Sequence, residues 1–132
     1  MPDPCLYDYA VIRVVPRVDR EEFVNAGAIV FCWERGYLAA AVELDEERVR
    51  ALDPSCDLEL VRSLLAAIPV LCAGGPEAGP IGRLTPRQRF DWLVAPRSTV
   101  IQTSPVHSGR CEDPAAALEQ VLATMVRTPR GD

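Results

Sequence analysis

The feature that most constrains the fold is an apolar segment near the start of the chain, from Leu6 to Val15. Its sequence, LYDYAVIRVV, is rich in β-branched and aromatic residues, and apolar residues fall on both of its alternating sets. A strand that is apolar on both faces is usually central in its sheet. Pro16 ends the segment, because proline lacks the N–H that a central strand donates. We therefore predict a central strand over residues 6–15.

Two further strands are predicted directly downstream. Residues 28–33 (AIVFCW) form a second continuous apolar run, and residues 37–42 form a third strand. The segment Glu34-Arg35-Gly36 between them is typical of a hairpin connection, because Gly36 tolerates a positive φ. The first part of the chain is therefore predicted to be an antiparallel meander.

Helical signals dominate the rest of the chain. Residues that favour a helix N-terminus begin four predicted helices: at Asp45, near Ser55 to Asp57, at Thr85 and at Asp113. The second of these helices is predicted to end near Ile68, because Pro69 follows it. A fourth strand is predicted over residues 98–103, and residues 105–112 are predicted to be a loop.

Strands that come first, helices that come later and one late strand predict an α+β fold. We expect an antiparallel sheet, made of the N-terminal meander plus one late strand, with helices packed mainly on one face. The 132 residues are predicted to form a single globular domain, 1–132, with a mobile Gly/Pro loop at about 73–82. One shared core is expected to bury Tyr9, Val11, Ile29, Phe31, Leu65, Leu118, Leu122 and Met125 together.

Composition excludes several chemistries. All fourteen basic residues are arginine, so Schiff-base catalysis and a P-loop lysine are excluded. The net charge of −5 disfavours nucleic-acid binding, which usually needs a basic excess. The apolar runs are each interrupted within about ten residues, so we expect no membrane span. The N-terminus lacks the pattern of a signal peptide, and the expected location is cytoplasmic.

The five cysteines are widely spaced, and no two form a C-x-x-C pair. The sequence also has a single histidine, so we predict free thiols, no metal site and no cofactor. His107 is the only imidazole that could activate a nucleophile, and Cys111 and Ser108 lie near it on the predicted loop. Catalytic groups normally converge from separate segments, so neither a Cys–His pair nor a hydrolase triad is favoured.

A first polar cluster consists of Arg13, Glu22 and Asn25. Arg13 lies in the buried strand, where an unpaired charge is costly. One interpretation is structural: Arg13 pairs with Glu22 or Asp8, and Asn25 bonds the local backbone. The other is functional: Arg13 binds an anion, with Glu22 as base and Asn25 as orienting amide. If the first two strands pair, the structural interpretation predicts that Arg13 and Glu22 lie within direct or single-water reach.

A second polar group is Arg97-Ser98-Thr99, at a predicted helix-to-strand junction. A guanidinium beside two hydroxyls suits a phosphate or a carboxylate. Arg97 or Arg17 could therefore join Arg13 in an anion site. The same three residues suit the start of a strand equally well, so both interpretations stay open.

Three segments resemble one bacterial family. They are YAVIRVVP at residues 9–16, EFVNAGAIVF at residues 22–31 and WLVAPRSTVIQ at residues 92–102. The chain is identified from them as a member of the domain of unknown function 3037 family (DUF3037). The resemblance implies a small single-domain protein with no established activity and supplies no catalytic residues. Members often lie beside genes for HipA-like kinase-fold proteins, so the resemblance implies such a partner.

Two functional hypotheses follow. The first is an accessory or binding domain that acts through protein–protein contact, with a HipA-like kinase-fold protein as the implied partner. The alternative is a small enzyme or ligand-binding protein for an anionic small molecule that uses the Arg/Glu/Asn cluster. Convergence of Arg13, Glu22, Asn25 and Arg97 on one pocket would favour the alternative. A homo-oligomer is compatible with either hypothesis.

Overall fold

The computed structural model describes residues 3–128. Its sheet has five antiparallel strands: β1 (Cys5–Val14), β2 (Val24–Cys32), β3 (Tyr37–Val42), β4 (Ile101–Thr103) and β5 (His107–Cys111). The order is β3-β2-β1-β4, and β5 also pairs with β1. β4 pairs with residues 12–14 of β1 and β5 with residues 5–9, so the two short strands follow one another along the edge of β1 away from β2. The prediction of a central first strand is confirmed.

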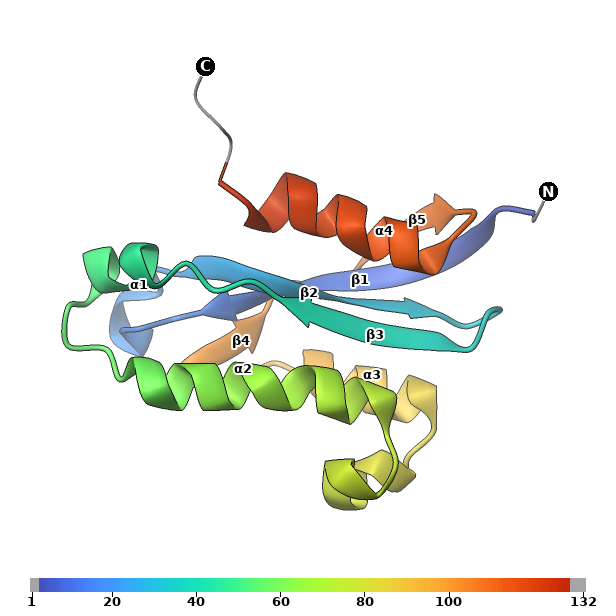
Figure 1. Cartoon of the computed structure of the whole chain (residues 1–132), viewed down its shortest axis with the longest axis horizontal. Coiled ribbons are helices and arrows are strands. Elements are labelled where there is room, and N and C mark those ends of the chain that lie inside the picture. The colour runs from blue at the N-terminus through green and yellow to red at the C-terminus, as the bar shows by residue number, and fades with distance from the viewer. Residues whose placement is uncertain (1–2, 129–132) are drawn as a thin grey trace.

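Helices cover both faces of the sheet (Figure 1). On one face lie α1 (Glu46–Leu52), α2 (Leu58–Ala73) and α3 (Pro86–Val94). On the other lies α4 (Pro114–Val121), which continues as the π-helical segment η3 (Leu122–Val126). Short 3-10 turns form η1 (Val18–Arg20) and η2 (Pro76–Arg83). The predicted α+β class is confirmed, with three of the four α-helices on one face.

Three boundaries differ from the predictions by three residues or more. β2 begins at Val24 rather than at residue 28, and the late strand β4 begins at Ile101 rather than at residue 98. Helix α2 continues through Pro69 to Ala73, because Ile68 and Cys72 both pack into the core and hold the last turn in place. Residues 76–82 of the predicted Gly/Pro loop lie in η2, whose helical backbone is interrupted at Gly79.

The segment 105–112, predicted to be a loop, contains a strand. Its sequence HSGRC at residues 107–111 has no apolar alternation, and its side chains are exposed or half-buried. Pairing with β1 stabilises it instead, in the register Cys5↔Cys111 to Tyr9↔His107. The chain therefore contributes two late strands rather than one, because an edge strand can gain its hydrogen bonds without an apolar face.

The sheet divides the interior into two cores, so the prediction of one shared core is wrong. Ile29, Phe31 and Leu65 belong to the core between the sheet and α1–α3. Val11, Leu118 and Leu122 belong to the core beneath α4, with Tyr9 at its margin. Met125 is 43% exposed and belongs to neither. The residues separate into two cores because successive side chains of β1 and β2 point to opposite faces of the sheet.

The segment Val24-Asn25-Ala26-Gly27 contains a β-bulge in its pairing with β1 and, at Gly27, a close approach to β3. The register changes from Ile12↔Gly27 to Arg13↔Asn25, which leaves Ala26 as the extra residue of β2. A Cβ placed on Gly27 would lie 2.5 Å from the Ala41 carbonyl oxygen of β3. Glycine is therefore required here by the close approach of two backbones rather than by a ligand.

Candidate functional site

Arg13 is not paired as the sequence predicted. Its guanidinium carbon lies 4.0 Å from the centre of the Phe23 ring, a cation–π contact. Its Nε is buried and has no hydrogen-bond partner. Glu22 instead accepts a hydrogen bond from Arg20 Nε, and Asp8 accepts one from Ser108 Oγ. The predicted Arg13–Glu22 contact is therefore wrong as a direct ion pair, because Glu22 finds a cation two residues away in its own turn.

Asn25 connects two distant parts of the fold. Its Nδ2 donates to the Met125 carbonyl oxygen at 2.8 Å, across 100 residues of sequence. This bond fastens β2 to the end of the C-terminal helix. The Asn25 amide thus donates to a distant backbone group rather than to the local backbone, and its Oδ1 is buried without a hydrogen-bond partner.

Arg17 and Arg97 are also used within the fold. Arg17 lies 3.9 Å from the carboxylate of Asp53, whose pKa is lowered by hydrogen bonds from Ser55 and, less strongly, by this guanidinium. Arg97 donates to the carbonyl oxygens of Leu93 at 2.9 Å and Trp92 at 2.6 Å, and it stacks over the Trp92 ring. A cation on the last carbonyls stabilises the C-terminus of α3.

Ser98 and Thr99 have different surroundings. The Thr99 hydroxyl donates to the Ile101 carbonyl oxygen at 2.9 Å, a local turn contact. Ser98 lines a cavity of about 260 Å³ together with Arg13, at the end of the sheet near η1; the other lining residues are Val15, Val18, Glu21, Phe23 and Gln102. Glu21 has the left-handed backbone conformation, with φ of 60°. Of the seven candidate residues, Arg13 and Ser98 meet at this cavity, whereas Arg97 and Thr99 line a different one, the apolar groove described below.

The nucleophile candidates are separated by the strand that carries them. His107 and Cys111 lie at opposite ends of β5, and four residues of strand span about 13 Å. The His107 ring packs at a tilt against the Tyr9 ring, and the Ser108 hydroxyl donates to the Asp8 carboxylate. Within residues 3–128, no group of three or more histidine, cysteine, aspartate or glutamate side chains is arranged to hold a metal ion. Over the same residues, no single helix is long and apolar enough to cross a membrane.

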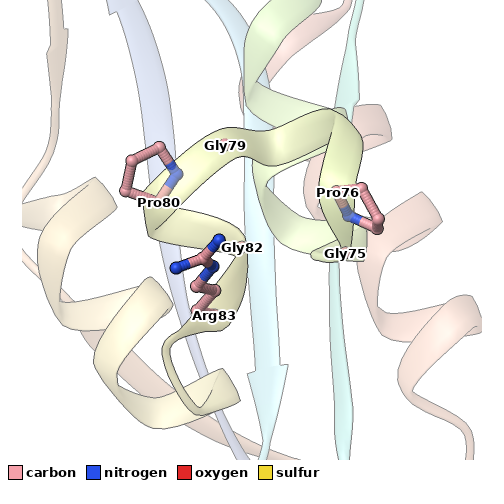
Figure 2. Close-up of a pocket in the computed structure, with 6 residues that line it drawn as sticks. All are labelled: Gly75, Pro76, Gly79, Pro80, Gly82 and Arg83. Atoms are coloured by element: carbon pink, nitrogen blue, oxygen red, sulfur yellow. The ribbon is translucent and has the colours of Figure 1, made fainter.

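Figure 2 shows a hollow formed by η2. Its volume is about 440 Å³, and it is lined by glycine and proline residues and by one charged side chain, Arg83. The lining includes no carboxylate, imidazole or thiol. Arg83 is the one titratable side chain in this lining, so the lining offers no pair of groups for acid–base catalysis.

An apolar groove that the sequence analysis missed lies between α2, α3 and β4. Its volume is about 370 Å³, and we name it the α2–α3 groove; it is lined by Leu64, Ala67, Ile68, Leu71, Trp92, Leu93, Arg97, Thr99, Ile101, Gln102 and Thr103. Leu64 is 40% exposed and Trp92 is 42% exposed. A large exposed tryptophan beside an exposed leucine is typical of a surface that contacts another molecule.

A sequence signal for this groove exists in α2. Val61, Leu65 and Ile68 face the sheet and account for the helix as a core element. Leu64, Ala67 and Leu71 form a second apolar stripe at the spacing i, i+3, i+7. One stripe suffices to pack a helix on a sheet, so a second stripe indicates a second contact surface.

The comparisons with known proteins agree with the family resemblance. A family model described as "Protein of unknown function (DUF3037)" matches residues 9–126. No curated protein and no solved structure matches the chain. The match spans most of the 132 residues, and the chain belongs to the DUF3037 family.

Proposed function

We propose that this member of the DUF3037 family is an accessory domain that binds a partner protein, with the α2–α3 groove as its docking surface. The observation that carries the proposal is the apolar lining of this groove, with Leu64 and Trp92 left exposed. Burying exposed apolar surface is favourable by roughly 25 cal/mol per Å². Tryptophan is also enriched among the residues that dominate binding energy at protein interfaces.

The polar candidates support the same proposal. Arg97, Asn25 and Arg17 are engaged in contacts that hold elements of the fold together. Glu22 pairs with Arg20 in its own turn. The four residues whose convergence would indicate an enzyme or ligand site therefore do not share one cavity.

The partner that we propose is a HipA-like kinase-fold protein, as the family resemblance implies, encountered in the bacterial cytoplasm. Its docking segment would present apolar side chains to the groove. The net charge of −5 favours basic residues around that segment, because complementary charge accelerates encounter and disfavours wrong partners.

Binding should depend on Leu64. We expect a HipA-like protein encoded beside the gene for this chain to bind the wild-type domain, measured by isothermal titration calorimetry. Leu64→Asp should weaken binding about 30-fold or more, the loss typical of an interface hot spot. Leu60→Asp is the matched control, since Leu60 is an exposed leucine of the same helix that does not line the groove; it should bind within about twofold of wild type.

Thermal melts of both variants establish that they are folded. Equal binding by Leu64→Asp and wild type would contradict the groove as the docking surface. Failure of the wild-type domain to bind would contradict the partner. Dimerisation of the domain alone, abolished by Leu64→Asp, would assign the groove to a second copy of this chain instead.

A second candidate function, binding of a small anion, is favoured by one observation. The buried Arg13 Nε lacks a hydrogen-bond partner, and Arg13 shares a cavity with the Ser98 hydroxyl. If this cavity binds inorganic phosphate or a short carboxylate, the ligand should raise the melting temperature of wild type, because it binds the folded state. This rise in melting temperature should be lost in Arg13→Gln. It should be kept in Arg17→Gln, because Arg17 does not line the cavity. No rise for wild type would end this candidate.

A further inference from the structure

Three of the five cysteines meet at one end of the sheet. Cys5 begins β1, Cys32 ends β2 and Cys111 ends β5. The Cys5 Sγ lies 3.2 Å from the Cys32 Sγ and 3.9 Å from the Cys111 Sγ. The sequence gives no sign of this cluster, because 27 and 106 residues separate Cys5 from its two neighbours.

The sheet geometry places the three side chains on the same face. Cys5 shares its alternating set with Val11, and Cys32 shares its set with Val30; both valines lie in the core beneath α4. Cys111 is the direct cross-strand partner of Cys5. Directly opposed residues of antiparallel strands have Cα atoms about 4.5–5.5 Å apart, within the range of about 4.4–6.8 Å that a disulfide requires.

Access differs among the three thiols. Cys5 and Cys32 are buried, whereas Cys111 is half-exposed. A reagent dissolved in water therefore reaches Cys111 first. Burial, together with the contact to Cys5, raises the pKa of Cys32 and keeps it in the less reactive thiol form.

An arginine holds the backbone around this cluster. Arg35, in the turn between β2 and β3, donates to the carbonyl oxygens of Glu112 at 2.8 Å and Asp3 at 2.9 Å. Glu112 adjoins Cys111, and Asp3 lies two residues before Cys5. The guanidinium thus fixes the strand ends that carry the two thiols.

We propose that Cys111 and Cys5 form a peroxide-sensitive modification site, whose product is a disulfide between β5 and β1. The Cys111 thiolate attacks one oxygen of hydrogen peroxide, the O–O bond breaks, and a sulfenic acid and hydroxide form. The Cys5 sulfur then attacks the Cys111 sulfur, and the S–O bond breaks as the S–S bond forms. The leaving hydroxide takes up a proton. Overall, two thiols and one peroxide give one disulfide and two waters, so the protein loses the two electrons that the peroxide gains.

Peptide mapping tests this assignment, because trypsin, which cleaves after arginine, leaves the five cysteines on five different peptides. Reduced protein is treated with hydrogen peroxide, alkylated and digested without reductant, and the peptides are identified by mass spectrometry. We expect the peptide that ends at Arg13 to be linked to the peptide from Cys111 to Arg127. The intact monomer should lose two hydrogens in mass, and dithiothreitol should reverse the change.

Three variants make the test specific. Cys5→Ser and Cys111→Ser should each abolish the link. Cys56→Ser is the matched control, since Cys56 is also half-exposed but lies outside the cluster, and it should form the link as wild type does. A Cys5–Cys32 link in place of Cys5–Cys111, a link only between molecules, or over-oxidation of Cys111 with Cys5 still reduced would each overturn the proposal.

Discussion

Replacing Phe90 by alanine is expected to lower the free energy of unfolding by about 3–5 kcal/mol, as truncation of a buried phenylalanine does. Phe90 is 1% exposed and lies on α3. Its ring stacks on Phe31 of β2, with 5.3 Å between the ring centres. The loss combines the apolar transfer of the ring, the cavity left against the sheet and the aromatic pair itself.

Urea denaturation followed by circular dichroism measures this effect. Phe23→Ala is the matched control, because Phe23 is 42% exposed and contacts the Arg13 guanidinium. Its loss should cost about 1 kcal/mol at most, the size of an exposed cation–π contact. Equal losses for the two variants would mean that α3 does not pack on the sheet as described.

The second large effect is expected on the opposite face of the sheet. Leu122→Ala should lower the free energy of unfolding by about 2–5 kcal/mol, because Leu122 is buried in the core between the sheet and the C-terminal helix. This helix provides most of the cover for that core (Figure 1). Truncating Leu122 leaves a cavity that the surrounding strands can fill only in part.

Met125 provides the control within the same turn. Its side chain is 43% exposed, so Met125→Ala should change the free energy of unfolding by about 0.5 kcal/mol or less. The Asn25 bond to Met125 uses the backbone carbonyl and survives this substitution. A loss for Leu122→Ala below about 1 kcal/mol would show that the helix packs elsewhere or frays.

The two proposed sites, the α2–α3 groove and the Cys5–Cys111 pair, lie on opposite faces of the sheet. The α2–α3 groove lies on the face covered by α1–α3, whereas the cysteine cluster lies on the α4 face. Substitutions in the groove and oxidation of Cys5 and Cys111 therefore act on opposite sides of the sheet. Sites far apart without shared partners usually act additively, so each proposal is testable without disturbing the other.

Local signals in the sequence predicted the elements well. The apolar runs of β1 and β2 indicated two-sided burial, and β1 lies between β2 and the β4 and β5 edge. The capping residues also act as predicted, since each accepts a hydrogen bond from the backbone of its own helix: Asp45, Asp57, Thr85 and Asp113. Strand burial patterns and helix caps depend on residues only a few positions apart, so they can be predicted directly from the sequence.

The polar contacts could not be read in the same way. Asn25 bonds a carbonyl 100 residues away, and Arg97 turns back onto the end of the preceding helix, α3. Arg13 stacks on Phe23 rather than pairing with a carboxylate. A long charged side chain can reach several partners, and its contacts with them have similar energies. Which contact forms therefore depends on where the fold places each partner.

By itself, the sequence determined the α+β class, the central position of the first strand and the helix starts, because hydrophobic periodicity and capping are local properties of the chain. Only the tertiary structure decided the strand pairing of β5, the division into two cores, the α2–α3 groove and the meeting of Cys5, Cys32 and Cys111. Each of these joins residues far apart in the chain. Such contacts arise when backbone hydrogen bonding and apolar burial are satisfied for the whole sheet at once, and no local pattern records that outcome.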